Sequence, residues 1–286
     1  MPELPEVETI ARSLRQPADL PFSDSTDLKT RPGVVNRVVS DVEINWHRSI
    51  AFPDWAAFSK GLQNRKIVNV SRRAKYLLFE LDHNWMLIHL RMSGDIRVEP
   101  RISSLNLPHD RVILNFQDDA RMVFNDTRKF GRLWLLEDPL QVLSKLGPEP
   151  FLPELTPEGF FESLNNRKRA IKPLLLDQAF IAGLGNIYTD EALHIAGIHP
   201  LQKAASINRE QAGVLLQAIR SVLQEGIRRN GASIDWVYRG GDFQNYFSVY
   251  QRSGEPCPVC GVKIERIVVS QRGTHFCPNC QKHQCD

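Results

Sequence analysis

Apolar residues recur with two different periods along the chain. Val7, Ile10, Ala11 and Leu14 stand three to four residues apart, as on one face of a helix, and predict a helix over Glu6–Arg15. From residue 34 to 136 the pattern changes to short β-branched and apolar runs separated by turn residues, which predict strands. These runs are Val34–Val42, Ile67–Val70, Tyr76–Leu81, Trp85–Leu90, Asp95–Val98, Val112–Phe116, Met122–Phe124 and Leu133–Leu136, with a helical interruption at Ala56–Leu62. Strands of this length favour a sandwich or barrel.

The second half of the chain has a helical period. The predicted helices are Glu158–Leu164, Ala170–Ala179, Ile187–Ala196 and Arg209–Arg229, the last capped by Ser206 or Asn208. Four prolines between Gly147 and Pro157 exclude a helix or a central strand there and predict a linker. The predicted class is therefore α+β in two domains. The expected divisions are a β-domain at 1–146, a linker at 147–157, a helical domain at 158–256 and a metal-binding end at 257–286.

Four of the five cysteines form two Cys-x-x-Cys turns, Cys257 with Cys260 and Cys277 with Cys280. This spacing is strongly specific for one tetrahedral zinc ion. Four thiolates leave no open coordination position, so the zinc is expected to be structural. The alternative is two disulfides, although nothing else in the sequence indicates secretion. Cys285 is predicted to be a spare surface thiol.

The N-terminus offers different chemistry. Removal of Met1 would expose the secondary amine of Pro2 beside the carboxyl group of Glu3. An α-amine titrates at about 8, so a useful fraction is unprotonated near neutral pH and can form a Schiff base with an electrophilic carbon. The alternative is a flexible start in which Glu3, Glu6 and Glu8 only stabilise the first turn of the helix.

Composition adds limits but no specific function. The 286 residues are 42% hydrophobic and 24% charged, which suits one large or two ordinary globular domains. No signal peptide or membrane span is apparent, so an intracellular protein without membrane partners is expected. The net charge of +3 is a weak indication of a polyanionic partner. Basic residues cluster at 72–75, 167–172 and 228–229, although such clusters are more often solvated faces.

A glycine-rich turn, Gly183–Tyr188, leads into a predicted helix. Such a turn lets backbone N–H groups and Asn186 approach a phosphate closely at the helix N-terminus. By itself the turn is weak evidence for phosphate binding, because tight helix–helix turns also use glycine for steric reasons.

Taken together, six segments resemble bacterial formamidopyrimidine-DNA glycosylases, which remove oxidised purines and nick the abasic site. The resemblance extends over nearly the whole chain. The opening Pro-Glu-Leu-Pro favours this branch over the related endonuclease VIII branch, which usually opens Pro-Glu-Gly-Pro. The segments are Pro2–Thr9, Arg72–Leu77, His89–Gly94, Asp126–Gly131, Gly183–Tyr188 and the zinc hairpin with Gln271–Thr274.

The resemblance implies an N-terminal β-sandwich with flanking helices, a helix-two-turn-helix motif and a zinc finger. It also implies a mechanism in which a damaged nucleotide is flipped out of duplex DNA and Pro2 attacks its C1′. Glu3 assists by proton transfer, and a Schiff base is followed by β,δ-elimination. No cofactor other than one structural Zn²⁺ is implied. The expected partner is double-stranded DNA with oxidised bases or abasic sites, and the protein is expected to be a monomer in the bacterial cytoplasm, associated with the nucleoid.

Site residues follow by position in the matching segments. The catalytic set is Pro2, Glu3, Lys75 and Glu6, where Glu6 either holds the N-terminal turn or handles protons. Contacts to phosphates around the flipped nucleotide are expected from Lys75, His89, Asn186 and Arg272.

Three further residues match those that fill the vacated stack, because extrusion of a base costs a few kcal/mol. They are Met92, Arg128 and Phe130, with Arg128 facing the widowed cytosine. The alternatives are core packing for Met92 and Phe130, a solvated chain for Lys75 and a satisfied core residue for His89.

Two segments depart from the family pattern. Pro17–Pro32 is longer than the usual loop after the first helix, and Ala232–Phe243 is about four residues shorter than the segment that closes over 8-oxoguanine. We therefore expect 8-oxoguanine to be a weaker substrate than formamidopyrimidines. Two other functions stay open: a non-catalytic zinc protein that binds lesions, and a glycosylase-lyase that prefers oxidised pyrimidines.

Overall fold

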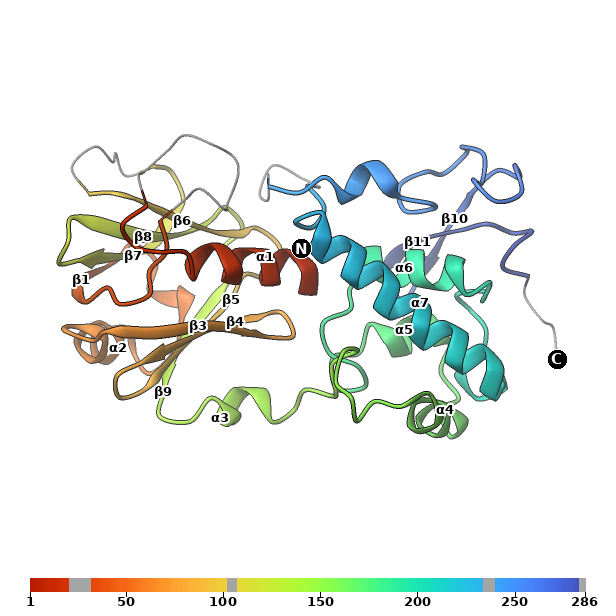
Figure 1. Ribbon diagram of the computed structural model, residues 1–286, viewed down its shortest axis with the longest axis horizontal. Coiled ribbons are helices and arrows are strands. Elements are labelled where there is room, and N and C mark those ends of the chain that lie inside the picture. Colours follow the sequence, from red (N-terminus) through yellow and green to blue (C-terminus); the bar gives the residue numbers. More distant parts are fainter. Residues whose placement is uncertain (21–31, 102–106, 234–239, 283–286) are drawn as a thin grey trace. The chain divides into compact units, whose positions relative to one another are not determined.

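The computed structural model describes residues 1–20, 32–101, 107–233 and 240–282. The chain folds into two compact units (Figure 1). The first unit comprises Met1–Ser144 together with Asn230–Gly241, and the second comprises Lys145–Arg229 together with Asp242–Asp286. The predicted linker at 147–157 and the separate division at residue 257 stay predictions. Each unit is described below by itself.

Two sheets form the first unit, and the four-stranded sheet lies above the five-stranded one in Figure 1. The four-stranded sheet has the order β1-β7-β8-β6 and is antiparallel throughout. The five-stranded sheet has the order β2-β9-β5-β4-β3, and only its β2–β9 pair is parallel. The strands are β1 (Val39–Ile44), β2 (Ile50–Phe52), β3 (Ile67–Arg73), β4 (Tyr76–Leu81), β5 (Trp85–His89), β6 (Gly94–Pro100), β7 (Asp110–Phe116), β8 (Ala120–Asp126) and β9 (Arg132–Leu136).

Apolar side chains from both sheets meet in one core, so the first unit is a β-sandwich as predicted. Helix α1 (Leu4–Leu14) adds Val7, Ile10, Ala11 and Leu14 to this core, all at most 4% exposed. These are the four residues whose spacing predicted the helix. Helix α2 (Trp55–Leu62) is capped by Asp54, whose side chain accepts from the N–H groups of Ala56 and Ala57, and it packs against β1.

Four local features of the first unit differ from the prediction. The strand expected from residue 34 begins only at Val39, because Asn36 has a left-handed backbone with φ of 71°. The short exposed strand β2 was missed, as were a single turn η2 (His47–Ser49) and helix α3 (Leu140–Leu143). Each of these missed elements is only three or four residues long, too short for a period to show.

Helices form the second unit. They are α4 (Pro157–Asn165), α5 (Ile171–Leu175), α6 (Asn186–Ile195) and α7 (Arg209–Arg228), with turns η3 (Ala204–Ser206) and η4 (Phe243–Tyr246). Asn208 caps α7 in a capping box with Gln211, which settles the choice between Ser206 and Asn208. The helix predicted over Ala170–Ala179 is only five residues long. Within the described residues, no helix has the length and apolar character needed to span a membrane.

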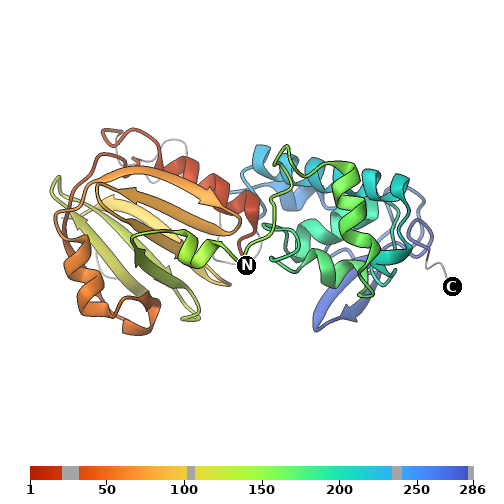
Figure 2. The ribbon, with the colours of Figure 1, turned by 90° about the horizontal axis from the view of Figure 1, so that it is seen from below.

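The β10–β11 hairpin follows these helices and extends below them in Figure 2. Strands β10 (Glu265–Val269) and β11 (Arg272–Phe276) are antiparallel, and the two residues between them, Ser270 and Gln271, both have positive φ. This is the hairpin predicted between the two Cys-x-x-Cys turns. Most of Pro17–Pro32, Cys285 and the middle of Ala232–Phe243 lie outside the described residues.

Candidate functional site

The N-terminal turn holds two of the predicted catalytic residues in buried positions. Glu3 is the N-cap of α1, and its backbone N–H donates to Glu6 Oε2 at 2.7 Å. The Glu3 side chain accepts in return from the Glu6 backbone, which completes a capping box. Both residues are 2% exposed, and Pro2 is buried directly beside them. The start of the chain is thus tightly held, unlike the flexible start considered above.

Lys75 lies in the turn between β3 and β4, and α1 packs against both strands. An ion pair of 3.0 Å joins Arg72 Nε to Glu8 Oε2 and so fixes this hairpin to α1. Burial alone would raise the pKa of Glu8. Hydrogen bonds from Arg12 and Arg72 outweigh this effect and hold the pKa below its usual value. Lys75 itself is only 4% exposed, so it is not the solvated lysine of the alternative interpretation.

His89 ends β5 directly opposite Tyr76 of β4, and the two rings meet edge to face. Burial, with repulsion from Arg91 and Lys75, lowers the pKa of His89 to about 3. Its Nδ1 accepts from the backbone N–H of Arg91 at 3.0 Å. The ring is therefore neutral at physiological pH with its proton on Nε2, so that it can donate one hydrogen bond.

Met92, Arg128 and Phe130 lie on two neighbouring loops that we call the wedge loops, residues 91–93 after β5 and 127–131 after β8. Met92 is 37% exposed and Phe130 is 47% exposed, which excludes core packing for both. The Arg128 guanidinium lies over the Phe130 ring at 5.1 Å from its centroid. Arg132, the first residue after these loops, pairs with His89 across β9 and β5.

Two buried residues that the sequence did not single out fasten the wedge loops together. The Ser93 hydroxyl hydrogen-bonds the Asp126 carboxylate and accepts from the backbone N–H of Arg128 at 3.0 Å. Asp126 also accepts from the backbone N–H of Gly131 at 2.7 Å and is completely buried. In the sequence, the only indication that Ser93 and Asp126 join the loops was that both are polar and lie in segments that resemble the family.

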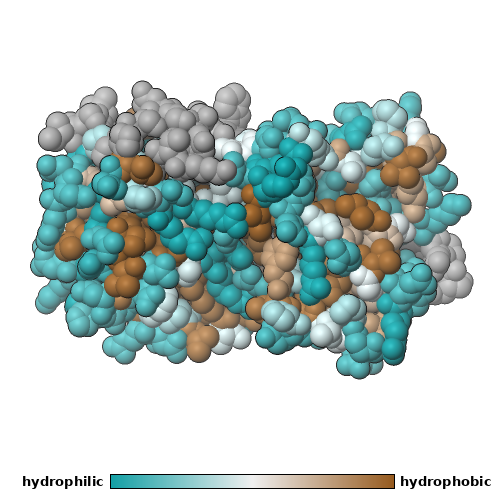
Figure 3. Space-filling model, viewed as in Figure 1, coloured by the Kyte–Doolittle hydropathy of each residue, from teal (hydrophilic) through white to brown (hydrophobic). Residues whose placement is uncertain are grey.

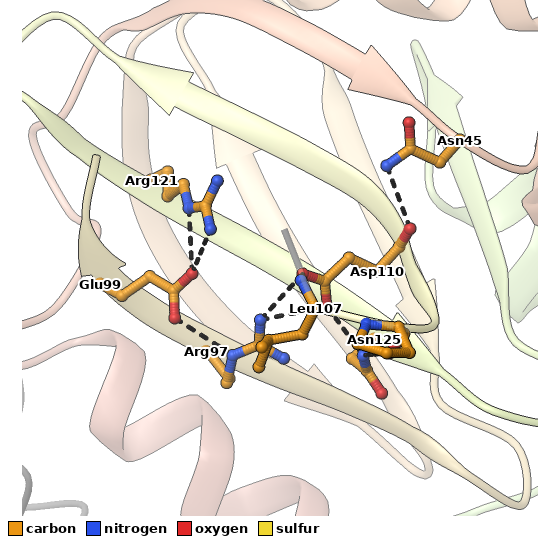
Figure 4. A network of polar contacts seen from close by, with 8 residues as sticks. Asn45, Arg97, Glu99, Leu107, Asp110, Arg121 and Asn125 are labelled. Atoms are coloured by element: carbon orange, nitrogen blue, oxygen red, sulfur yellow. Dashed lines mark hydrogen bonds and ion pairs between the residues drawn. The ribbon is translucent and has the colours of Figure 1, made fainter. Parts of the chain in front are cut away.

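A polar network on the four-stranded sheet stabilises the base of these loops (Figure 4). Arg97 bridges Glu99 and Asp110, and Asp110 also accepts from Asn125 at 2.7 Å. Arg111, which follows Asp110 in β7, donates through Nε to the carbonyl oxygen of Asp126 at 2.7 Å. The network thus fixes the end of β8 from which the second wedge loop leaves.

The outer face of α1 carries hydrophilic side chains (Figure 3). They include Glu8, Arg12 and Arg15, where the Glu8 carboxylate binds both arginines as well as Arg72. The Glu8 carboxylate therefore neutralises part of the positive charge on this face. This agrees with the view that a basic cluster by itself does not indicate a binding site.

In the second unit, Asn186 and Arg272 lie on adjoining elements. Asn186 is the first residue of α6, and its Nδ2 donates to the carbonyl oxygen of Gly273, the residue after Arg272, at 2.9 Å. Its Oδ1 is buried without a hydrogen-bond partner in the described residues. Arg272 begins β11 and is exposed. The turn of the hairpin is thus attached to the helix N-terminus.

A buried lysine, which the sequence grouped with a basic cluster, reinforces this attachment. Lys172 Nζ contacts Asp190 Oδ1 at 2.6 Å, Thr274 Oγ1 at 2.8 Å and the Gly273 carbonyl oxygen at 3.2 Å. Lys172 is completely buried, and Asp190 is 1% exposed. Lys172 is therefore a structural link between α5, α6 and the hairpin rather than part of a solvated face.

The four predicted metal ligands converge. The sulfur atoms of Cys257, Cys260, Cys277 and Cys280 all lie within 4.8 Å of one another. Distances of 3.9 Å between Cys257 and Cys280 and 3.4 Å between Cys260 and Cys277 suit a tetrahedral Zn²⁺, whose Zn–S bonds of about 2.3 Å separate sulfurs by about 3.8 Å. All four are free cysteines, so they form no disulfides.

The first unit therefore brings Pro2, Glu3, Glu6, Lys75 and His89 together with the wedge loops, and the second brings Asn186 together with Arg272 on the zinc hairpin. The connections within the first unit are the Arg72–Glu8 ion pair, the Tyr76–His89 strand pair and the His89–Arg132 strand pair.

Three protein-family models match the chain in the order of these features. They are the formamidopyrimidine-DNA glycosylase N-terminal domain at residues 24–133, the formamidopyrimidine-DNA glycosylase H2TH domain at 146–237, and the zinc finger found in FPG and IleRS at 254–282. The last match and the four sulfurs agree on a single structural zinc.

Whole-chain comparisons agree with the family models. The formamidopyrimidine-DNA glycosylase of Chloroflexus aurantiacus is 45% identical over 98% of both chains, and that of Protochlamydia amoebophila is 39% identical over 99% of this chain and 100% of its own. The Lactococcus lactis Fpg, solved in complex with DNA containing an abasic site, superimposes with a TM-score of 0.87 at 34% identity, covering 99% of this chain and 100% of its own.

Fold, zinc site and similarities together define the class, a zinc-finger DNA glycosylase of base excision repair. The chain belongs to the formamidopyrimidine-DNA glycosylase family. Its enzyme activity is accordingly that of a DNA-formamidopyrimidine glycosylase, and lyase action at abasic sites is part of that family's activity.

Proposed function

We propose that the protein excises oxidised purines from duplex DNA through a Schiff base on Pro2 and then nicks the strand by β,δ-elimination. The observation that carries this proposal is the position of Pro2, buried beside Glu3 at the start of α1. The family membership adds the expectation that DNA is the substrate.

In this mechanism the Pro2 amine, exposed by removal of Met1, attacks C1′ of the flipped nucleotide. The bond from C1′ to the base breaks, and Glu3 moves a proton to the departing base. Loss of the amine proton leaves a neutral aminal at C1′, and cleavage of the C1′–O4′ bond, with a proton taken up by O4′, opens the sugar ring. The resulting iminium ion acidifies the adjacent sugar proton at C2′. Elimination of the 3′ phosphate and then of the 5′ phosphate follows, and hydrolysis of the product regenerates the amine.

Four residues are proposed to hold the phosphates around the flipped nucleotide: Lys75, His89, Asn186 and Arg272. Donors without base specificity suit this task. The neutral His89 ring, with its Nε2–H, offers such a donor without adding charge. The zinc supports the hairpin that carries Arg272.

Met92, Arg128 and Phe130 are proposed to enter the stack that the flipped nucleotide leaves, with Arg128 facing the widowed cytosine. Their exposure and the Ser93–Asp126 link support this role, because an inserting group must be both accessible and firmly held.

For the lesion, we propose formamidopyrimidines as the better substrates and 8-oxoguanine as the weaker one. The short segment Ala232–Phe243 supports this ranking. The Lactococcus lactis Fpg, which is 34% identical, has been solved with DNA that contains N7-benzyl-Fapy-dG. A monomer that acts at the nucleoid in the bacterial cytoplasm completes the proposal, and the bacterial relatives support that setting.

Borohydride trapping tests the mechanism. The protein is incubated with three duplexes, carrying formamidopyrimidine, 8-oxoguanine or an abasic site, and the adduct is mapped by mass spectrometry. We expect an adduct at residue 2 with each duplex, formed more slowly with 8-oxoguanine, and a slower adduct for Pro2→Gly, which replaces the secondary amine by a primary one. Intact mass of the purified protein checks that Met1 is absent.

Each other outcome identifies an alternative. Binding of all three duplexes without an adduct would indicate a lesion-binding protein without catalysis. If a fourth duplex that carries an oxidised pyrimidine gives an adduct and the two purine lesions do not, the protein has the pyrimidine-directed function. Equal rates for both purine lesions would contradict the proposed ranking.

A further inference from the structure

The segment that follows α7 returns to the first unit, although its neighbours on both sides belong to the second. Its two described ends, residues 230–233 and 240–241, lie against each other, and we call them the neck. The Ser233 hydroxyl donates to the Gly241 carbonyl oxygen at 2.6 Å and accepts from the Gly241 N–H at 2.9 Å. A Cβ on Gly241 would lie 2.0 Å from the Gly231 carbonyl oxygen, so the two ends are in close contact.

Glu6 joins this neck to the N-terminal turn. Its Oε1 accepts from the backbone N–H of Ala232 at 2.8 Å, while its Oε2 accepts from the backbone N–H of Glu3 at 2.7 Å. Ala232 stands 226 positions after Glu6 in the sequence. The one buried carboxylate of Glu6 thus connects Ala232 with Glu3, the residue next to Pro2. Each oxygen of this carboxylate thus accepts one backbone hydrogen bond.

The neck also leaves no room beside this carboxylate. Gly231 has φ of 83°, and a Cβ there would lie 2.7 Å from Glu6 Oε1 and 2.8 Å from Glu6 Cγ. Any side chain at position 231 would therefore displace Glu6, in addition to the backbone strain that a positive φ imposes.

We propose that Glu6 is a positioning residue through which the neck fixes the N-terminal turn. Ala232 and Gly231 hold the carboxylate in place, the carboxylate holds the Glu3 N–H, and this orients the Pro2 amine and the Glu3 side chain. The inference rests on the proposed role of Pro2, and it assigns Glu6 to support rather than to proton transfer. Both Glu6 oxygens accept from backbone N–H groups, as a carboxylate that holds the turn requires.

Three variants test the proposal in the full-length zinc-loaded protein. Glu6→Gln replaces one acceptor oxygen by an NH₂ group, which opposes one of the two N–H donors. Gly231→Ala keeps the carboxylate chemically intact but displaces it. Gly254→Ala is the matched control, because Gly254 has φ of 85° and no atom lies within 4 Å of the place that a methyl group would take, so it suffers the same backbone strain without a collision.

The readout is the single-turnover rate of borohydride trapping on an abasic-site duplex, with affinity for a reduced abasic-site duplex measured alongside. Loss of one hydrogen bond to a charged group corresponds to a rate change of about tenfold or more. We expect that decrease for Glu6→Gln and for Gly231→Ala, with affinity changed less than about threefold. Gly254→Ala should trap like the wild type, and the double variant Glu6→Gln/Gly231→Ala should be no slower than its slower parent, because both changes break the same contact.

Two outcomes would overturn the inference. If Gly231→Ala traps as fast as Gly254→Ala while Glu6→Gln is slow, Glu6 acts in proton transfer and not through the neck. If both variants trap at the wild-type rate, the contact has no part in the reaction. A wild-type protein that forms no adduct would instead contradict the proposed function itself.

Hydrogen exchange distinguishes a local effect of the substitution from poor folding of the whole variant. In the wild type, the amides of Glu3 and Ala232 should both be protected, and Glu6→Gln should raise the exchange rate of one of them about tenfold or more while peptides from β7 and β8 stay unchanged. Unchanged exchange at both amides would contradict the link between Glu6 and the neck.

Discussion

The two units hold the loops of their candidate sites with different kinds of buried carboxylate. In the first unit, Asp126 is surrounded by neutral donors, namely the Ser93 hydroxyl and the backbone N–H groups of Arg128 and Gly131. In the second unit, Asp190 faces the ammonium group of Lys172 at 2.6 Å, with both side chains completely buried. Neutral donors carry the whole stabilisation of Asp126, whereas Asp190 combines the ion pair with one backbone donor, the N–H of His275 at 2.9 Å from Oδ2. The second arrangement should therefore be more sensitive to the loss of a single partner.

The sharpest test of this difference is Lys172→Met. This change leaves the Asp190 carboxylate buried without its counter-charge, for which a cost of about 3–5 kcal/mol in the free energy of unfolding is typical. Chemical denaturation of the zinc-loaded protein measures it. Lys168→Met, which removes an exposed lysine of the same segment, should change the stability by less than about 0.5 kcal/mol.

The double variant Lys172→Met/Asp190→Asn sharpens the same point. Removing the stranded charge should recover part of the stability lost in Lys172→Met. A double variant that is less stable than Lys172→Met would mean that the contacts of Asp190 with the hairpin, rather than the ion pair, dominate.

His89 gives the first unit a pH dependence of its own, because its burial and the charges of Arg91 and Lys75 all disfavour the protonated ring. Its pKa falls from about 6.5 in the unfolded chain to about 3, so protonation favours unfolding, and stability decreases as pH falls through this window. At pH 5 the contribution is about 2 kcal/mol relative to neutral pH. The curve of unfolding free energy against pH should be flatter for His89→Gln than for the wild type between pH 6.5 and 4.

Exposed His83 supplies the comparison for this measurement. His83→Gln should leave the slope of the wild-type curve nearly unchanged. A His89→Gln curve that runs parallel to the wild type would mean that His89 titrates normally in the folded protein.

The smallest expected effect concerns the neutral contacts of Asp126. Ser93→Ala removes one hydroxyl that joins the wedge loops but leaves the backbone donors in place, so the expected loss is about 1 kcal/mol in the free energy of unfolding. Ser59→Ala, which removes a half-buried hydroxyl on α2, is the matched control in the same unit. A loss above about 3 kcal/mol for Ser93→Ala would remove the contrast with Lys172→Met.

The sequence predicted most of the fold because the decisive patterns are local. The strand Tyr76–Leu81 was predicted with its observed bounds, and the four residues that predicted the first helix are the ones buried by α1. The Cys-x-x-Cys spacing likewise indicated the zinc site. Elements of three or four residues, such as β2, lack enough positions to show a period.

The supports of the site could not be predicted in the same way, because their partners are distant in the sequence. Lys172 contacts a carbonyl group 101 residues away, and Ser93 contacts a carboxylate 33 residues away. Lys172 stood in an apparent basic cluster, and only its burial distinguishes it from the exposed Lys168 beside it. Resemblance to the family indicated candidate functional side chains but gave no information on what holds them.

The neck has a consequence for the order in which the protein is synthesised. The first unit includes residues 230–241, which are synthesised long after Met1–Ser144. The Ala232 amide in this segment is one of the groups that hold Glu6. A ribosome adds about 5–20 residues each second, so the β-sandwich emerges and can collapse roughly five to twenty seconds before Ala232 is made. During that interval the N-terminal turn lacks the hydrogen bond between Glu6 and the Ala232 amide, and so one of the contacts that hold it in the finished protein.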